Sequence, residues 1–310
     1  MPGNFDPSLG GPGPSPFQAL HTLHTLRAPE GQPQMTPNDL KLAQNTPPPR
    51  IALGRQNFAG TQIGDPAVAA ADAMTAASVD KIRPGMSIAI TAGSRGIACL
   101  PEPLAAIVQQ VRARGAHPFV VPAMGSHGGA TAEGQTALLA RLGVSEATIG
   151  CDIRSSMGTV EIGVLDNGMS VRMDRHAHGA DGIVLFIRIK PHTSFRALVE
   201  TGLAKMLAVG LGKQSGAETC HARGIDNVRT YAAQMAKMKL ARRRVLFGIG
   251  TVENAHDGLS RVVVLDSDGM IGAEAMLPEL RDRPGSGVIG ELQDMRFEDG
   301  RLSNPWAGLP

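Results

Sequence analysis

The chain has 310 residues, of which 42% are hydrophobic and only 3% aromatic, and its formal net charge is +2. This length is enough for one large domain or two ordinary ones with a well-buried core. The weak charge, with Arg242-Arg243-Arg244 as its basic run, argues against nucleic acid as a partner. No apolar run approaches the roughly 20 residues of a membrane span, which argues against a membrane partner.

The sequence favours a cytoplasmic location. Its three cysteines, Cys99, Cys151 and Cys220, form no Cys-x-x-Cys pair, and three thiols cannot all pair with one another. This pattern is typical of a reducing compartment. The first residues lack the basic start and the apolar stretch of a signal peptide.

Three regions differ in composition. Residues 1–49 are rich in Pro, Gly, Gln, Asn and Ser, and such a segment cannot bury enough apolar surface to offset the entropy of ordering. We therefore expect a disordered tail there. Residues 50–254 have the patterns of an α/β domain, whereas the periodicity fades within residues 255–310. The last region is expected to be a remnant of a second α/β domain or an irregular tail.

Strand and helix patterns alternate from the start of the predicted domain. An Ala-rich helical stretch at 67–77 is followed by a buried strand at 86–90, a helix at 101–114 and a second strand at 118–122. Thr131 is placed to cap the next helix, which should run to about residue 142.

The same alternation continues to residue 265. The elements expected there are a hairpin over 160–171, a strand at 182–187, helices at 198–209 and 226–240, and strands at 245–249 and 261–265. This rhythm predicts an α/β fold: a Rossmann-like, mostly parallel sheet flanked by helices, with a shortened second C-terminal region. In such sheets ligands bind at the carboxyl ends of the strands.

Two glycine-containing loops follow the first two predicted strands, at 93–96 and 125–129. Arg95 lies in the first, and its guanidinium could bind a carboxylate through two parallel hydrogen bonds. His127 lies in the second, where an imidazole can exchange protons near neutral pH. The alternatives are a surface arginine and an anion-binding loop with an incidental histidine.

Three further residues could carry chemistry. His192 follows the strand at 182–187 and would lie at the same edge, either as a ligand contact or as an ordinary polar loop residue. Lys205 has apolar neighbours in its predicted helix, so it either reaches solvent or is desolvated in a pocket, where a free amine can form covalent bonds. In Cys220-His221, adjacent residues rarely reach one metal ion together, so His221 is the expected ligand.

Taken in order, these five residues resemble the nickel-pincer lactate racemase family, whose members interconvert 2-hydroxy acids. The matching stretches, within residues 88–254, are Gly93-Ser94-Arg95-Gly96, 125–133, 189–193 and 201–210. The resemblance implies a small-molecule 2-hydroxy acid substrate and a nickel pincer nucleotide cofactor (pyridinium-3,5-bisthiocarboxylic acid mononucleotide nickel). It also implies cofactor-synthesis enzymes as partners, and it leaves a homo-oligomer open.

The resemblance assigns one role to each position. Lys205 would anchor the cofactor covalently, and His221 would be the protein ligand to nickel. His127 and His192 would be the catalytic acid/base pair, one on each side of the substrate, and Arg95 would bind the substrate carboxylate.

Two features differ from the family pattern. Ala92 stands where lactate racemases have an acidic residue three positions before the arginine, and the region after Asn254 is too short for a full second domain. The particular 2-hydroxy acid is therefore left open. Two alternatives also remain: a related α/β protein that binds a small carboxylate or nucleotide without catalysis, and a hydrolase with a simple metal ion held by histidines.

Overall fold

The computed structural model describes residues 61–94, 97, 99–190, 202–221, 225–254, 256–273, 296–298 and 301–303. The predicted tail at 1–49 lies outside these residues, and so do Arg95 and His192. Within the described helices, none is long and apolar enough to cross a membrane.

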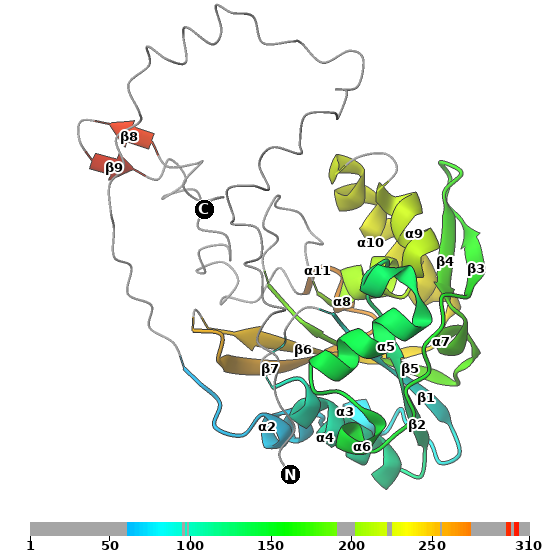
Figure 1. Ribbon diagram of the computed structural model, residues 1–310, viewed down its shortest axis with the longest axis vertical. Coiled ribbons are helices and arrows are strands. Elements are labelled where there is room, and N and C mark those ends of the chain that lie inside the picture. Colours follow the sequence, from blue (N-terminus) through cyan, green and yellow to red (C-terminus); the bar gives the residue numbers. More distant parts are fainter. Residues whose placement is uncertain are drawn as a thin grey trace, which may run out of the picture. The chain divides into compact units, whose positions relative to one another are not determined.

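A five-stranded sheet forms the centre of the described fold (Figure 1). Its order is β2-β1-β5-β6-β7, with the bounds β1 Ser87–Ala92, β2 His117–Pro122, β5 Gly182–Arg188, β6 Val245–Glu253 and β7 Leu259–Asp266. The first four strands are parallel, and β7 pairs antiparallel with β6. The mostly parallel α/β sheet that the sequence predicts is thereby confirmed. The sheet extends to Asp266, past residue 254, where the sequence suggested an end to the first domain.

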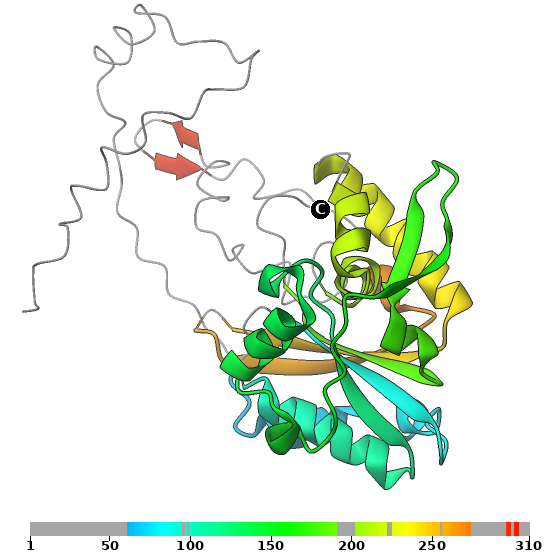
Figure 2. The same ribbon diagram turned by 45° about the vertical axis from the view of Figure 1, so that its right-hand side comes forward.

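Helices cover both faces of this sheet (Figures 1 and 2). On one face lie α2 Pro66–Ala73, α3 Ala76–Val79, α4 Pro101–Ala113 and α6 Glu146–Ile149. On the other face lie α8 Leu203–Lys205, the π-helix Met206–Gly210, α9 Lys213–His221 and α10 Ile225–Arg242. The remaining helices are α5 Ala132–Arg141, α7 Arg175–Gly179, α11 Met270–Ala273 and the short 3-10 helix Gly128–Ala130. Two antiparallel strand pairs lie outside the main sheet. One is β3 Thr159–Val164 with β4 Ser170–Asp174, and the other is β8 Arg296–Glu298 with β9 Arg301–Ser303.

Alternate side chains of each inner strand enter two separate cores. Ile88, Ile90 and Phe186 belong to the core on the α4 side, whereas Ala89 and Leu185 belong to the core beneath the π-helix and α10. Because both faces are covered, the inner strands are continuous apolar runs, as expected of a parallel sheet.

Local signals place several elements as predicted. The helix expected at 101–114 is α4, and the hairpin expected at 160–171 is formed by β3 and β4. Thr131 caps α5, because its hydroxyl oxygen accepts a hydrogen bond of 3.0 Å from the Gly134 amide. The sequence analysis missed α9, however, and did not predict that the helix carrying Lys205 continues as a π-helix.

Candidate functional site

A cavity of about 680 Å³ opens at the carboxyl ends of the parallel strands. Its walls include Ser94 after β1, His127 after β2, Arg188 at the end of β5 and Glu253 at the end of β6. The chain passes from β1 to β2 and returns to β5 on the other side of β1, so the cavity lies at a switch in strand order. Its volume is in the range typical of small-molecule sites.

His127 is an exposed side chain on the cavity wall. Its ring nitrogen Nδ1 is hydrogen-bonded to the hydroxyl of Ser94, which follows β1. A hydroxyl on one ring nitrogen fixes the orientation of an imidazole and biases its tautomer. Ser94 is thus a second polar contributor from a neighbouring strand, and the sequence analysis did not identify it as a site residue.

The glycines around His127 serve the loop's own packing. Gly125 has a φ of +58°, and its amide donates to the carbonyl of Gly210, 3.1 Å away. A Cβ at Gly128 would come within 2.7 Å of the backbone at Gly134 on α5. At Gly128 the close neighbour is therefore the protein's own helix.

Lys205, the last residue of α8, lines the same cavity. Its helix begins after Gly202, whose φ of 145° and ψ of −151° lie in a region that is essentially restricted to glycine. Directly after Lys205 the helix continues as a π-helix, Met206–Gly210. π-Helical turns within helices are frequent at functional sites.

This helix is held against the His127 loop through the main chain. Besides the Gly125–Gly210 hydrogen bond, a Cβ at Gly210 would lie 2.5 Å from the carbonyl oxygen of Ala123. Only glycine allows that approach, so the backbone itself brings the two segments together.

A buried lysine supports the π-helix from behind. Lys239 of α10 is fully buried, and its Nζ donates to the carbonyls of Leu207 and Ala208 at 2.8 and 2.9 Å. Burial lowers the pKa of Lys239 to about 7. A neutral amine keeps the two N–H donors that these carbonyls need.

This pKa predicts a pH-dependent stability. Between pH 7 and the ordinary lysine pKa of 10.5 the unfolded chain binds more protons than the folded chain, so stability should rise with pH. Below pH 7 Lys239 is protonated in both states and its contribution is constant. Burial raises the pKa of the Cys151 thiol from 9.0 to about 11. Between these pH values the folded chain keeps the thiol proton longer than the unfolded chain, which lowers stability as pH increases. The test window is therefore pH 7 to 9.

We expect Lys239→Met to flatten this rise, as measured by urea unfolding at pH 7, 8 and 9. Lys237→Met is the matched control, because Lys237 is exposed on the same helix. Equal slopes for wild type and Lys239→Met would contradict the assignment.

An ion pair forms another part of the cavity wall. Nη1 of Arg188 lies 2.7 Å from Oε2 of the buried Glu253, and Nη2 lies 3.9 Å from Oδ1 of Asp257. Lys190 also lines the cavity. The sequence analysis did not single out these residues, although Arg188 and Glu253 end parallel strands, the signal that identified the two glycine loops.

The structure brings together two of the five predicted site residues, His127 and Lys205. Arg95 and His192 lie outside the described residues. His221 is the last residue of α9, and its side chain is also outside the described part. Among the side chains that are described, no three His, Cys, Asp or Glu residues gather as a metal site.

Comparison with solved structures finds a similar fold in the lactate racemase apoprotein from Thermoanaerobacterium thermosaccharolyticum. The TM-score is 0.52 and the sequence identity 16%; the match covers 74% of this chain and 60% of that chain. No model of a protein family matches the sequence, and no curated protein matches it either. At this identity the likeness shows the fold, and function has to be argued from the site.

Proposed function

We propose that this chain is a racemase or epimerase of a 2-hydroxy acid that works with a nickel pincer nucleotide. The observation that carries the proposal is the shared cavity of His127 and Lys205, an acid/base candidate and an anchor candidate that are 78 positions apart in the sequence. Their convergence at the carboxyl edge of the sheet is what the family resemblance requires.

The residues of the cavity fit such a cofactor. Lys205 offers an amine on the wall, and Lys190 lines the same cavity with a second cationic side chain, whereas the charge of Arg188 is offset by Glu253. Ala217 of α9 lines the cavity, and position 221 lies one helical turn further along that helix. In the proposal Lys205 binds the cofactor covalently and His221 is its nickel ligand.

The protein's own part in the reaction is proton transfer and orientation. When bound, the cofactor supplies the acceptor for the hydride on the substrate's C2. His127, oriented by Ser94, takes the proton from the substrate hydroxyl of one enantiomer. His192 does so for the other enantiomer, and Arg95 holds the carboxylate; both roles are proposed from the resemblance alone.

The decisive experiment is an intact-mass and metal measurement on protein produced together with the cofactor-synthesis enzymes. We expect a cofactor adduct on Lys205 and one nickel ion per chain. Lys205→Ala should lose the adduct, whereas Lys237→Ala, which changes an exposed lysine outside the cavity, should keep it. His221→Ala should lose the nickel.

A second candidate is a protein that binds a small carboxylate or nucleotide without racemising it. The observation in its favour is that the cavity has a volume of about 680 Å³ and cationic side chains, Lys190 and Lys205, on its wall, which suffice to bind such a ligand. An unmodified, metal-free chain would support this candidate, and zinc without an adduct would instead indicate a metal-dependent hydrolase.

A further inference from the structure

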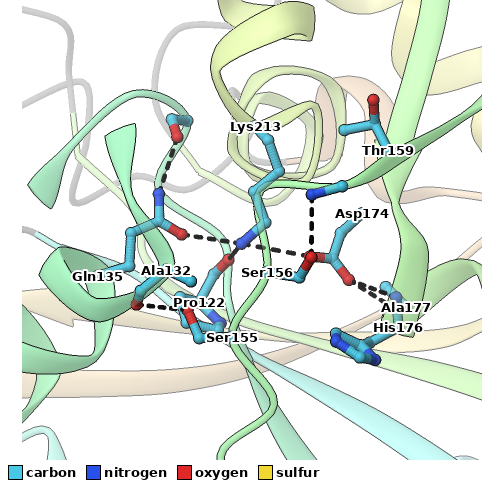
Figure 3. Close-up of polar contacts among 12 residues, drawn as sticks. Pro122, Ala132, Gln135, Ser155, Ser156, Thr159, Asp174, His176, Ala177 and Lys213 are labelled. Carbon is cyan, nitrogen blue, oxygen red and sulfur yellow. Dashed lines mark hydrogen bonds and ion pairs between the residues drawn. The ribbon is translucent and has the colours of Figure 1, made fainter. Parts of the chain in front are cut away.

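Lys213 and Asp174 form a buried ion pair next to Gln135 (Figure 3), whose side chain contacts the loop that carries His127. The ammonium of Lys213 is 3.3 Å from Oδ2 of Asp174, and both side chains are fully buried. Lys213 also donates to the Pro122 carbonyl at 2.5 Å and to Oε1 of Gln135 at 2.9 Å. Buried ion pairs are weak evidence for stability, because desolvation opposes their attraction. This pair therefore calls for another explanation.

The ammonium fixes the orientation of the Gln135 amide. Lys213 has only donors, so the amide oxygen of the fully buried Gln135 must face it. The amide nitrogen must then face the opposite way, where it donates to the carbonyls of Gly125 and His127 at 2.9 and 3.3 Å. A single side chain thus connects the buried charge to both ends of the segment 125–127.

Asp174 is itself fixed in place. Its Oδ1 accepts from the amides of His176 and Ala177 at 2.8 and 2.9 Å and so caps α7, which leaves Oδ2 directed at Lys213 (Figure 3). Lys213 has a φ of 53°, a conformation that residues other than glycine rarely adopt. Such backbone geometry persists where the surroundings enforce it, and it is enriched at functional sites.

The Gln135 amide adds to the main-chain contacts of the loop, in which the amides of Gly125 and His127 donate to the carbonyls of Gly210 and Met124 at 3.1 Å. Ser126 and His127 are exposed, and Gly125, Gly128 and Gly129 all have positive φ values. Glycines leave a segment with high conformational entropy. Hydrogen bonds from a buried amide to both ends of the segment 125–127 therefore help to position the backbone that carries the imidazole.

We propose that Lys213 and Gln135 are positioning residues for His127, with Lys213 orienting the amide and Gln135 holding the loop. The role in catalysis rests on the proposed racemase function. The effect on the loop can be measured whether or not the chain racemises a substrate.

The test compares two variants of Gln135 with one control, all in the full chain produced together with the cofactor-synthesis enzymes. Gln135→Met removes the amide, and Gln135→Glu keeps an oxygen toward Lys213 but replaces the donor that faces the loop. Gln214→Met removes an exposed amide on α9 outside the network. Gln135→Glu also serves as the test variant if Gln135→Met fails to fold.

We expect both Gln135 variants to lower kcat by about tenfold to a hundredfold per adduct-carrying chain, with KM changed less than about twofold, because a displaced base slows the chemical step. Amide hydrogen exchange over 125–130 should be faster in both variants and unchanged in Gln214→Met. A wild-type protein with neither adduct nor activity would reject the racemase function. Faster amide exchange over 125–130 in the folded Gln135 variants would support the positioning role even then. The proposal would be overturned if amide exchange over 125–130 were as slow in both Gln135 variants as in the wild type. It would also be overturned if the active variants had the kcat of the wild type.

Discussion

His127→Ala should lower the rate of racemisation by about a hundredfold to ten-thousandfold, the range typical for loss of a general acid/base. The imidazole lines the cavity, and the Ser94 hydroxyl orients it. Because two enantiomers have equal free energy, kcat/KM must fall by the same factor in both directions. The side chain is exposed, so its removal should leave the fold intact, and the proposed cofactor site should keep its nickel.

The measurement is the racemisation rate of each enantiomer, normalised to the amount of cofactor adduct. His117→Ala is the control, because His117 is an exposed histidine at the amino end of β2, away from the cavity edge. If His127→Ala kept full activity in both directions, the assignment of His127 as acid/base would be wrong.

The largest expected effect on stability comes from Asp174→Ala, which should lower the free energy of unfolding by about 3–5 kcal/mol. The substitution leaves the fully buried ammonium of Lys213 without its carboxylate. It also removes the cap of α7, since the amides of His176 and Ala177 lose their acceptor. Urea unfolding at neutral pH measures the change.

A double-mutant cycle separates these two causes. Asp174→Ala combined with Lys213→Met has no unpaired charge, so it should recover part of the loss, and the remainder reflects the cap and the packing. Asp152→Ala is the control, because it breaks an exposed pair with Arg154 that should contribute less than about 1 kcal/mol. A loss of similar size in Asp152→Ala and Asp174→Ala would contradict the argument.

The sequence predicted the fold well where short-range patterns determine structure. Apolar runs bounded by turns predicted β1, β2 and β5, and apolar residues at helical spacing predicted α4. The capping residue Thr131 predicted the start of α5. It missed α9, because the buried positions of that helix include Gly216, Ala217 and Cys220, which are too small to produce a clear apolar periodicity.

The site was predictable only in part. The rule that ligands bind at the carboxyl ends of parallel strands selected His127, and the family resemblance selected Lys205; both line the cavity. The support beneath them was not predictable, because Lys213 and Lys239 are fully buried and lysine is among the residue types least often buried. Their acceptors come from distant segments, and no local pattern encodes such a contact.

The hydrogen bond between Gly125 and Gly210 has a consequence for how ligand preference could be altered. Because the histidine loop and the lysine helix meet through main-chain atoms, a substitution in the cavity wall of the helix removes no atom of this contact. Met206 and Val209 line the cavity from the same helix. Exchanging them for smaller apolar residues would enlarge the space for a ligand's side group while leaving the main-chain hydrogen bond between the two segments in place.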